Sequence, residues 1–284
     1  MTATETNSWD HPDIRALIEL ALQEDIGPGD ITSAATIPES RQSEGRFYAR
    51  QDMVLAGVEL LPIIFAMRGG VDTMELLAAS GDRIEAEHAV ARVRGRARTL
   101  LECERVSLNF LQRLSGVATL ARKYTDAVAG THCRVLDTRK TTPGFRRLEK
   151  LAAAAGGVTN HRMGLFDAVL IKNNHITAAG GVRAALESVR DMNSVPVEIE
   201  IRTRQELDEA LEAGATHVLL DNLTPKQAAA EIQYIAGRAR VELSGNITLD
   251  TIRAYAHTGA NFVSSGAITH QAQAVNFNFR IELQ

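Results

Sequence analysis

Basic side chains are concentrated between residues 137 and 172 of this chain, although its formal net charge is −4. They are Arg139, Lys140, Arg146, Arg147, His161, Arg162 and Lys172. Arginine forks and lysine point charges bind carboxylates and phosphates. Such a local excess of positive charge predicts a concave site for a small molecule that carries several negative charges.

The members of this basic segment are expected to differ in role. Arg146 and Arg147 fall on a helical pattern and are interpreted as part of a solvated helix face. His161 and Arg162 lie between the other cations of the segment, which favours a binding role over a structural one. Five further histidines have no companions at metal-ligand spacing and are interpreted as structural: His88, His132, His217, His257 and His270.

The spacing of apolar residues, which predicts the helices and strands that carry this basic segment, changes along the chain. Up to about residue 115 the pattern is mixed, with a helix expected at 12–24, strand-like segments at 45–57 and 89–96, and a long helix at 98–129. From about residue 130, short apolar runs typical of strands alternate with helical stretches. The expected strands are 134–136, 168–171, 197–201, 217–220, 241–243 and 262–263, and the expected helices are 145–155, 181–192, 204–213, 225–236 and 249–257.

This alternation predicts parallel strands joined by right-handed crossovers. Six strands favour an incomplete (β/α) barrel, and a doubly wound open sheet is the competing architecture. The C-terminal segment alternates Val275, Phe277, Phe279 and Ile281, so it is expected to form a strand that pairs back onto the first region.

Polar residues follow all six expected strands. In barrels the carboxyl ends of the strands build the active site, so these residues are expected to share one mouth. They include Asp137, Thr138, Arg139 and Lys140 after the first strand, Lys172 after the second, and Asp221 after the fourth. The last two strands lead into small-residue turns that suit a phosphate group: Ser244, Gly245 and Asn246, and Ser265, Gly266 and Ala267.

The third strand, 197–201, carries acidic residues within an apolar run. Because strand side chains alternate between faces, Glu198, Glu200 and Arg202 are expected to point inward. Buried carboxylates are costly unless they are paired or bind a metal. Two interpretations stay open, a salt bridge to a neighbouring Lys or Arg, and a site for a ligand hydroxyl or a divalent ion such as Mg²⁺ held together with Asp221.

Composition limits the class of protein. Hydrophobic residues make up 45% of the chain and charged residues 23%, which is typical of a globular protein. The net charge predicts no general attraction to nucleic acid or to membranes. The two cysteines, Cys103 and Cys133, and the polar start of the chain indicate a reducing, cytoplasmic location.

Eight motifs follow one another along nearly the whole chain. They are EDIGPGDIT at 24–32, ECERVSLNFLQRLSGVAT at 102–119, DTRKTTPGFR at 137–146, the segment at 156–175, VEIEI at 197–201, LLDN at 219–222, VELSGNI at 241–247 and SSGAITH at 264–270. Together they resemble the quinolinate phosphoribosyltransferase family, also called carboxylating nicotinate-nucleotide pyrophosphorylases. Glycine is commoner in the family where Asn246 stands, and serine where Gln271 stands.

The resemblance implies an N-terminal α/β sandwich domain, residues 1–115 plus 268–284, joined to an incomplete α/β barrel domain, residues 116–267. The C-terminal strand would return to the N-terminal domain. The family also implies a homodimer, with higher oligomers compatible, in which each barrel mouth is completed by the partner. Arg105, otherwise interpreted as a surface residue, would then be a substrate ligand supplied by the partner subunit.

The implied reaction combines quinolinate with phosphoribosyl pyrophosphate to give nicotinate mononucleotide, pyrophosphate and CO₂. Arg139, Arg162 and Lys172 would bind the quinolinate carboxylates with Arg105, while His161 and Thr138 would orient the ring. Lys140 would neutralise the pyrophosphate, and the two small-residue turns would hold the 5′-phosphate. Glu200 and Asp221 would hold the ribose and stabilise its positive charge, directly or through Mg²⁺.

Three other functions are compatible with the same residues. One is a Schiff-base aldolase or decarboxylase that uses Lys140 or Lys172 as nucleophile. Another is a related phosphoribosyltransferase with a different acceptor. The third is a sensor that binds a phosphoribosyl metabolite without turnover.

Overall fold

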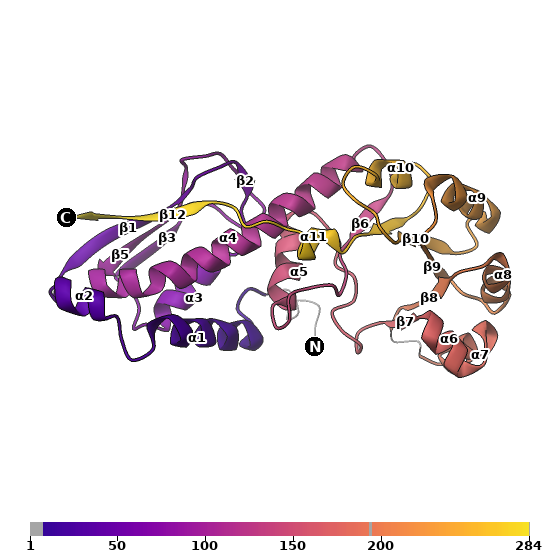
Figure 1. Ribbon diagram of the computed structural model, residues 1–284, viewed down its shortest axis with the longest axis horizontal. Helices are drawn as coiled ribbons and strands as arrows, with labels where there is room; N and C mark the ends of the chain where they lie inside the picture. Colours follow the sequence, from indigo (N-terminus) through magenta and orange to yellow (C-terminus); the bar gives the residue numbers. More distant parts are fainter. Residues whose placement is uncertain (1–7, 193–194, 284) are drawn as a thin grey trace. The chain divides into compact units, whose positions relative to one another are not determined.

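The computed structural model describes residues 8–192 and 195–283 (Figure 1). It divides into two compact units: residues 1–122, 142–157 and 271–284 form unit 1, and residues 123–141 and 158–270 form unit 2. The predicted domain boundaries at 115 and 268 stay a prediction. The polar residues 1–7, on which part of the location was argued, lie outside the described residues. Among the described residues, no helix is both long and apolar enough to span a membrane.

Unit 1 is built on an antiparallel sheet of strand order β12-β1-β5-β3, with helices α3 and α4 on one side of it (Figure 1). Alternate residues of β1 are buried, as a sheet with one covered face requires. The strands are β1 (Gln42–Ala49), β2 (Met53–Val54), β3 (Thr73–Leu76), β4 (Arg83–Ile84), β5 (Ala89–Arg96) and β12 (Phe277–Leu283). The helices are α1 (Pro12–Ile26), α2 (Ile31–Thr36), α3 (Leu60–Ala66), α4 (Ala97–Ala127) and α5 (Arg146–Ala155).

The C-terminal strand pairs back onto the first region, as predicted. β12 runs antiparallel to β1, with Phe279 opposite Phe47 and Ile281 opposite Gly45. The two phenylalanine rings lie 4.6 Å apart between centroids, so the end of the chain contributes to the buried face of this sheet.

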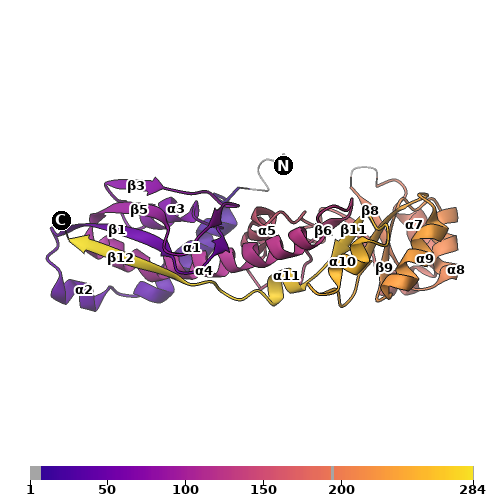
Figure 2. The same cartoon turned by 90° about the horizontal axis from the view of Figure 1, so that it is seen from above.

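Unit 2 contains a six-stranded sheet, drawn in the pink-to-yellow half of Figure 2. Its strands are β6 (Arg134–Leu136), β7 (Val169–Ile171), β8 (Val197–Ile201), β9 (His217–Asp221), β10 (Arg240–Ser244) and β11 (Phe262–Ser264). Its helices are α6 (Asn173–Ala179), α7 (Val182–Ser188), α8 (Arg204–Glu212), α9 (Pro225–Ile235), α10 (Ile252–Ala256) and α11 (Ala267–His270).

The order of these strands distinguishes the two predicted architectures. It is β6-β11-β10-β9-β8-β7, and every pair is parallel. The first strand therefore lies beside the last, as in a barrel, whereas a doubly wound sheet would reverse its order partway across. Within the described residues β6 and β7 are not paired, so the barrel is incomplete and its opening lies between its first two strands.

The sequence missed several short helices. α6 begins directly after β7, where no helix was expected, and the helix expected at 181–192 is only α7. α2 follows the glycine-rich turn at 27–29, where its N-cap Asp30 accepts hydrogen bonds from the backbone N–H groups of Thr32 and Ser33. Such short helices carry too few residues to show a clear periodicity.

Candidate active site at the carboxyl ends of the barrel strands

A cavity of about 360 Å³ opens at the carboxyl ends of the strands of unit 2. It collects polar residues that follow five of the six strands, as the strand-end pattern predicted. Its lining consists of Thr138, Arg139, Lys140, His161, Arg162, Leu170, Lys172, Leu219, Asp221, Asn222, Glu242, Ser244, Gly245, Asn246 and Ser264. Most of the predicted site residues therefore share one cavity.

The basic residues give the cavity its positive character. Arg162 is half-buried, and its Nη1 donates a hydrogen bond to the carbonyl of Ala168 at 3.2 Å. Burial lowers the pKa of Arg162, and the nearby charge of Arg139 lowers it further. Arg146 and Arg147 lie on α5 and do not line the cavity, but they are half-buried and not on a solvated face, and Arg147 pairs with Asp13 at 3.2 Å.

Both acidic residues of β8 are buried, but they have different partners. The carboxylate of Glu200 is 5% exposed and lies 2.7 Å from Nζ of Lys172, so a salt bridge, one of the two interpretations left open, is present. Glu198 instead lies between two imidazole rings, with its carboxylate 3.2 Å from Nε2 of His161 and 3.5 Å from Nε2 of His217.

The prediction for Arg202 is wrong. This residue follows the last residue of β8, Ile201, so the alternation of the strand no longer directs its side chain inward. Arg202 is exposed, and its Nη2 pairs with Glu206 on α8 at 2.5 Å.

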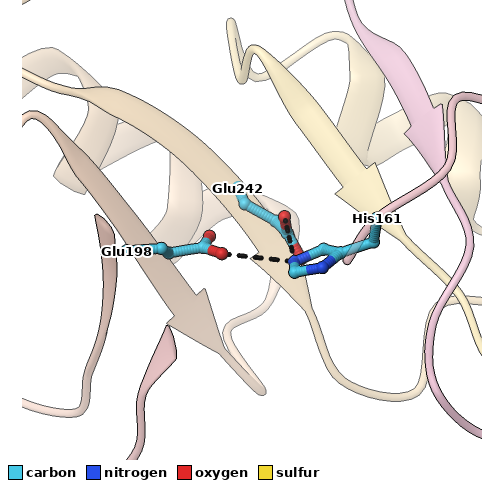
Figure 3. Close-up of side chains that lie close together, drawn as sticks. All are labelled: His161, Glu198 and Glu242. Atoms are coloured by element: carbon cyan, nitrogen blue, oxygen red, sulfur yellow. Dashed lines mark hydrogen bonds and ion pairs between the residues drawn. The ribbon is translucent and has the colours of Figure 1, made fainter. Parts of the chain in front are cut away.

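Glu242 is a buried site residue that the sequence reasoning missed. It lies in β10 with 1% exposure, and one of its carboxylate oxygens lies 3.5 Å from Nε2 of His161 (Figure 3). The sequence did contain a pattern that pointed to Glu242, because VEL at 241–243 repeats the apolar-acidic-apolar pattern of 197–199. His217, interpreted as structural, contacts Glu198 from the start of β9.

His161 is held in one orientation by the chain around it. Its backbone N–H donates to the carboxylate of Asp137 at 2.8 Å, and its Nδ1 accepts a hydrogen bond from the backbone N–H of Arg162 at 2.7 Å. Asp137 is fully buried and also accepts from the side chain of Asn160 at 2.7 Å. These bonds anchor the loop that carries Arg162.

The ring nitrogen of His161 and the carboxylates of Glu198 and Glu242 lie within 4.8 Å of one another, a spacing compatible with a metal ion. Coordination through Nε2 would require its lone pair, and therefore a proton on Nδ1. That position already faces the N–H of Arg162, and two donors cannot bond each other. The hydrogen bonds of this cluster therefore favour a proton on Nε2 over a metal.

The turn after β10 packs closely against the turn after β9. Gly245 has a φ of +97°, and a Cβ there would lie 2.3 Å from Oδ1 of Asn222. Asn222 donates to the carboxylate of Asp221 at 2.6 Å and accepts from Nδ2 of Asn246 at 3.3 Å. Asn246 also has a positive φ, of 52°, which Asn adopts more readily than most residues. This turn thus reaches Asp221 from the neighbouring strand.

The second predicted phosphate turn lies beside the cavity but does not line it. Ser265 is buried, and its hydroxyl donates to the carbonyl of Ile247 at 2.7 Å. Gly266 approaches the side chain of Lys140, and Ala267 begins the short helix α11. Ser264, a polar residue at the end of the sixth strand, lines the cavity in place of these residues. Arg105 lies in unit 1, exposed on α4.

Comparison with known proteins assigns the family. Residues 30–115 match the N-terminal domain of quinolinate phosphoribosyl transferase, and residues 117–280 match its C-terminal domain. The chain belongs to this family. The resemblance stated from the motifs, and the fold that it implied, are therefore confirmed.

Similar proteins extend over almost the whole chain. Quinolinate phosphoribosyltransferase [decarboxylating] 1b of Nicotiana tabacum is 40% identical over 96% of this chain and 84% of its own length. A probable nicotinate-nucleotide pyrophosphorylase [carboxylating] of Bacillus subtilis is 35% identical over 96% and 95% of the two chains. The solved nicotinate-nucleotide pyrophosphorylase of Francisella tularensis superposes with a TM-score of 0.90 at 34% identity, covering 98% and 99%.

Proposed function

We propose that this chain transfers the phosphoribosyl group of phosphoribosyl pyrophosphate to quinolinate and releases CO₂, giving nicotinate mononucleotide and pyrophosphate. The observation that carries the proposal is the cavity itself. Arg139, Arg162, Lys172 and Asp221 line it, and Lys172 pairs with the buried carboxylate of Glu200, in a chain that belongs to this family. Cations suit a pyridine dicarboxylate, and acidic groups suit a sugar that becomes positively charged.

Quinolinate binding would fall to the basic residues. Its two adjacent carboxylates lose water on entering the cavity, and charge-assisted hydrogen bonds from Arg139, Arg162 and Lys172 would replace that water. Thr138 and His161 would orient the ring. Both ring nitrogens of His161 face protein groups. His161 would therefore orient quinolinate by packing its ring against it.

The transfer step breaks the bond between C1 of the ribose and the pyrophosphate oxygen while the quinolinate nitrogen attacks C1. Positive charge grows on the sugar in such a transition state, and the carboxylates of Glu200 and Asp221 would stabilise it. Lys140 would neutralise the departing pyrophosphate. The turn of Ser244, Gly245 and Asn246 would hold the 5′-phosphate, with the turn of Ser265, Gly266 and Ala267 behind it.

The acidic residues suit Mg²⁺ bound mainly by substrate oxygens. Asp221 lines the cavity with a carboxylate oxygen already oriented by Asn222, whereas Glu200 is engaged by Lys172. Asp221, with Glu200 acting directly or through substrate and water, would hold the ion, which would supply charge neutralisation on the pyrophosphate.

Loss of CO₂ would follow ribosylation. The quaternary ring nitrogen then acts as an electron sink for the pair left on the neighbouring carbon when the C–CO₂ bond breaks. That carbon finally takes up a proton. The chemistry needs no covalent bond between substrate and protein.

The direct test is to mix the purified protein with quinolinate, phosphoribosyl pyrophosphate and Mg²⁺ and to measure CO₂ and nicotinate mononucleotide. We expect both products in equal amounts, and neither when phosphoribosyl pyrophosphate is left out. Release of CO₂ without it, or trapping of a carbonyl substrate by borohydride, would indicate a Schiff-base enzyme. Tight binding without turnover would indicate a sensor, and turnover with another acceptor a related transferase.

We further propose that the working form is a homodimer, in which Arg105 of each subunit completes the site of its partner. The exposed position of Arg105 on α4 is compatible with that role. Two free, buried cysteines, Cys103 and Cys133, support a reducing compartment such as the cytoplasm.

A further inference from the structure

An acidic cluster adjoins the basic cavity, which Glu242 and His161 line and Glu198 approaches through His161. Glu198 from β8 and Glu242 from β10 both approach Nε2 of His161 (Figure 3). Glu198 is 5% exposed and Glu242 1% exposed. Two buried negative charges so close to a site for a dianion would weaken its binding, so the protonation of this cluster matters for the proposed function.

His161 supplies only one proton to the two carboxylates. Its Nδ1 accepts the backbone N–H of Arg162, so the neutral ring carries its proton on Nε2, between Glu198 and Glu242. Glu198 has a second imidazole partner in His217. Glu242 has no Lys or Arg within ion-pair distance among the described residues, and its Oε2 has no hydrogen-bond partner there. Lys172, a cation that lines the cavity, pairs with Glu200.

The surroundings of Glu242 decide which carboxyl keeps a proton. Burial raises the pKa of Glu242 to about 8, and the charge of Glu198 acts in the same direction. A positive charge on His161 would lower the pKa, and the hydroxyl of Ser264 and the charge of Lys172 lower it as well, without overcoming burial. The other charged residues that line the cavity are Arg139, Lys140, Arg162 and Asp221.

We propose that Glu242 is a positioning residue which stays a neutral acid at neutral pH, so that the floor of the acceptor site carries one negative charge instead of two. Ionisation of Glu242 would place a second charge beside the bound diacid. This inference rests on the proposed function, because it concerns the binding of quinolinate.

The sign of the pH effect follows from this arrangement. The diacid binds better when Glu242 is protonated, so its affinity is highest below the pKa of Glu242 and falls as the pH rises through that value. If binding required the protonated form, the affinity at about pH 9 would be about tenfold lower than at about pH 7. Binding near pH 8 would also take up protons from solution.

Calorimetry with quinolinate tests both consequences. We expect the wild-type protein to lose affinity between about pH 7 and pH 9, and to show proton uptake when buffers of different ionisation enthalpy are compared near pH 8. In Glu242→Gln, which cannot ionise, the affinity ratio between the two pH values should approach one and the proton uptake should vanish. The matched control is Glu212→Gln, an exposed acid on α8, which should keep both effects.

A second measurement addresses Glu242 without any ligand. Carbon-13 NMR of labelled glutamate carboxyls in the free wild-type protein should show one that titrates near pH 8 and is missing in Glu242→Gln. A spectrum in which every carboxyl titrates below about pH 6 would overturn the inference, as would an alkaline loss of affinity that Glu242→Gln retains. A wild-type protein that has the titrating carboxyl but never binds quinolinate would contradict the proposed function instead.

Discussion

Arg162 is fixed in place by hydrogen bonds, yet part of its guanidinium is left to bind a ligand. Its backbone N–H bonds to His161 and its Nη1 to Ala168, while its Nε is buried without a hydrogen-bond partner among the described residues. A buried donor without a partner is costly unless a ligand completes it. The guanidinium is therefore prepared for an anion.

Replacing Arg162 with alanine should greatly weaken quinolinate binding. A hydrogen bond to a charged group contributes about 1.5–3 kcal/mol, so the loss in affinity should be about tenfold to a hundredfold. Calorimetry measures it, with Arg240→Ala, an exposed arginine at the start of β10, as the control. Unchanged affinity in Arg162→Ala would remove this residue from the site.

Glu200 is expected to act in the transition state. Glu200→Ala should lower kcat by about two to three orders of magnitude, as losses of preorganised electrostatic groups do, with a smaller change in KM. Steady-state kinetics separate the two constants. If Glu200 served only to pair with Lys172, KM for quinolinate would change instead and kcat would stay nearly normal.

Among the helices and strands, the packing of α4 against the C-terminal segment depends on one glycine, Gly116. A Cβ on Gly116 would lie 2.1 Å from the carbonyl oxygen of Gln273, in the segment that leads to β12. This contact lies within unit 1, between its long helix and the C-terminal segment. The close approach explains a glycine in the middle of a long helix.

Gly116→Ala tests that packing, because two effects of opposite sign compete. Alanine favours an isolated helix by about 1 kcal/mol, whereas overpacking against backbone costs about 1–3 kcal/mol or more. We expect the clash to dominate and the free energy of unfolding to fall, measured by denaturant titration. Asn109→Ala, at an exposed site of α4, should change it little. A stabilised Gly116→Ala protein would contradict the contact.

At the scale of the whole molecule, the proposed sharing of sites can be tested by mixing variants. Arg105→Ala and Arg139→Ala subunits should each be nearly inactive alone. In a mixed dimer one site would have both residues intact, so random mixing should restore about a quarter of wild-type activity. Activity assays after subunit exchange, with mass spectrometry to verify mixed dimers, measure this. Inactive mixed dimers would show that Arg105 does not act across the interface.

Local patterns along the chain were enough to predict much of unit 2 and of its site. All six barrel strands were predicted to within about one residue at each end, because a buried strand between helices is a local apolar run. Polar residues at the strand ends then predicted one shared mouth, which the structure contains. The order of the eight motifs was enough to identify the family.

Which of these residues contact one another could be learned only from the folded chain. Glu242, Glu198 and His161 come from segments far apart in the chain, and their contact depends on strand order and on the path of one loop. Arg202 looked like part of the site but pairs with Glu206, because β8 ends one residue earlier. Periodicity describes neighbours along the chain, whereas the charge of a buried group is set by neighbours in space.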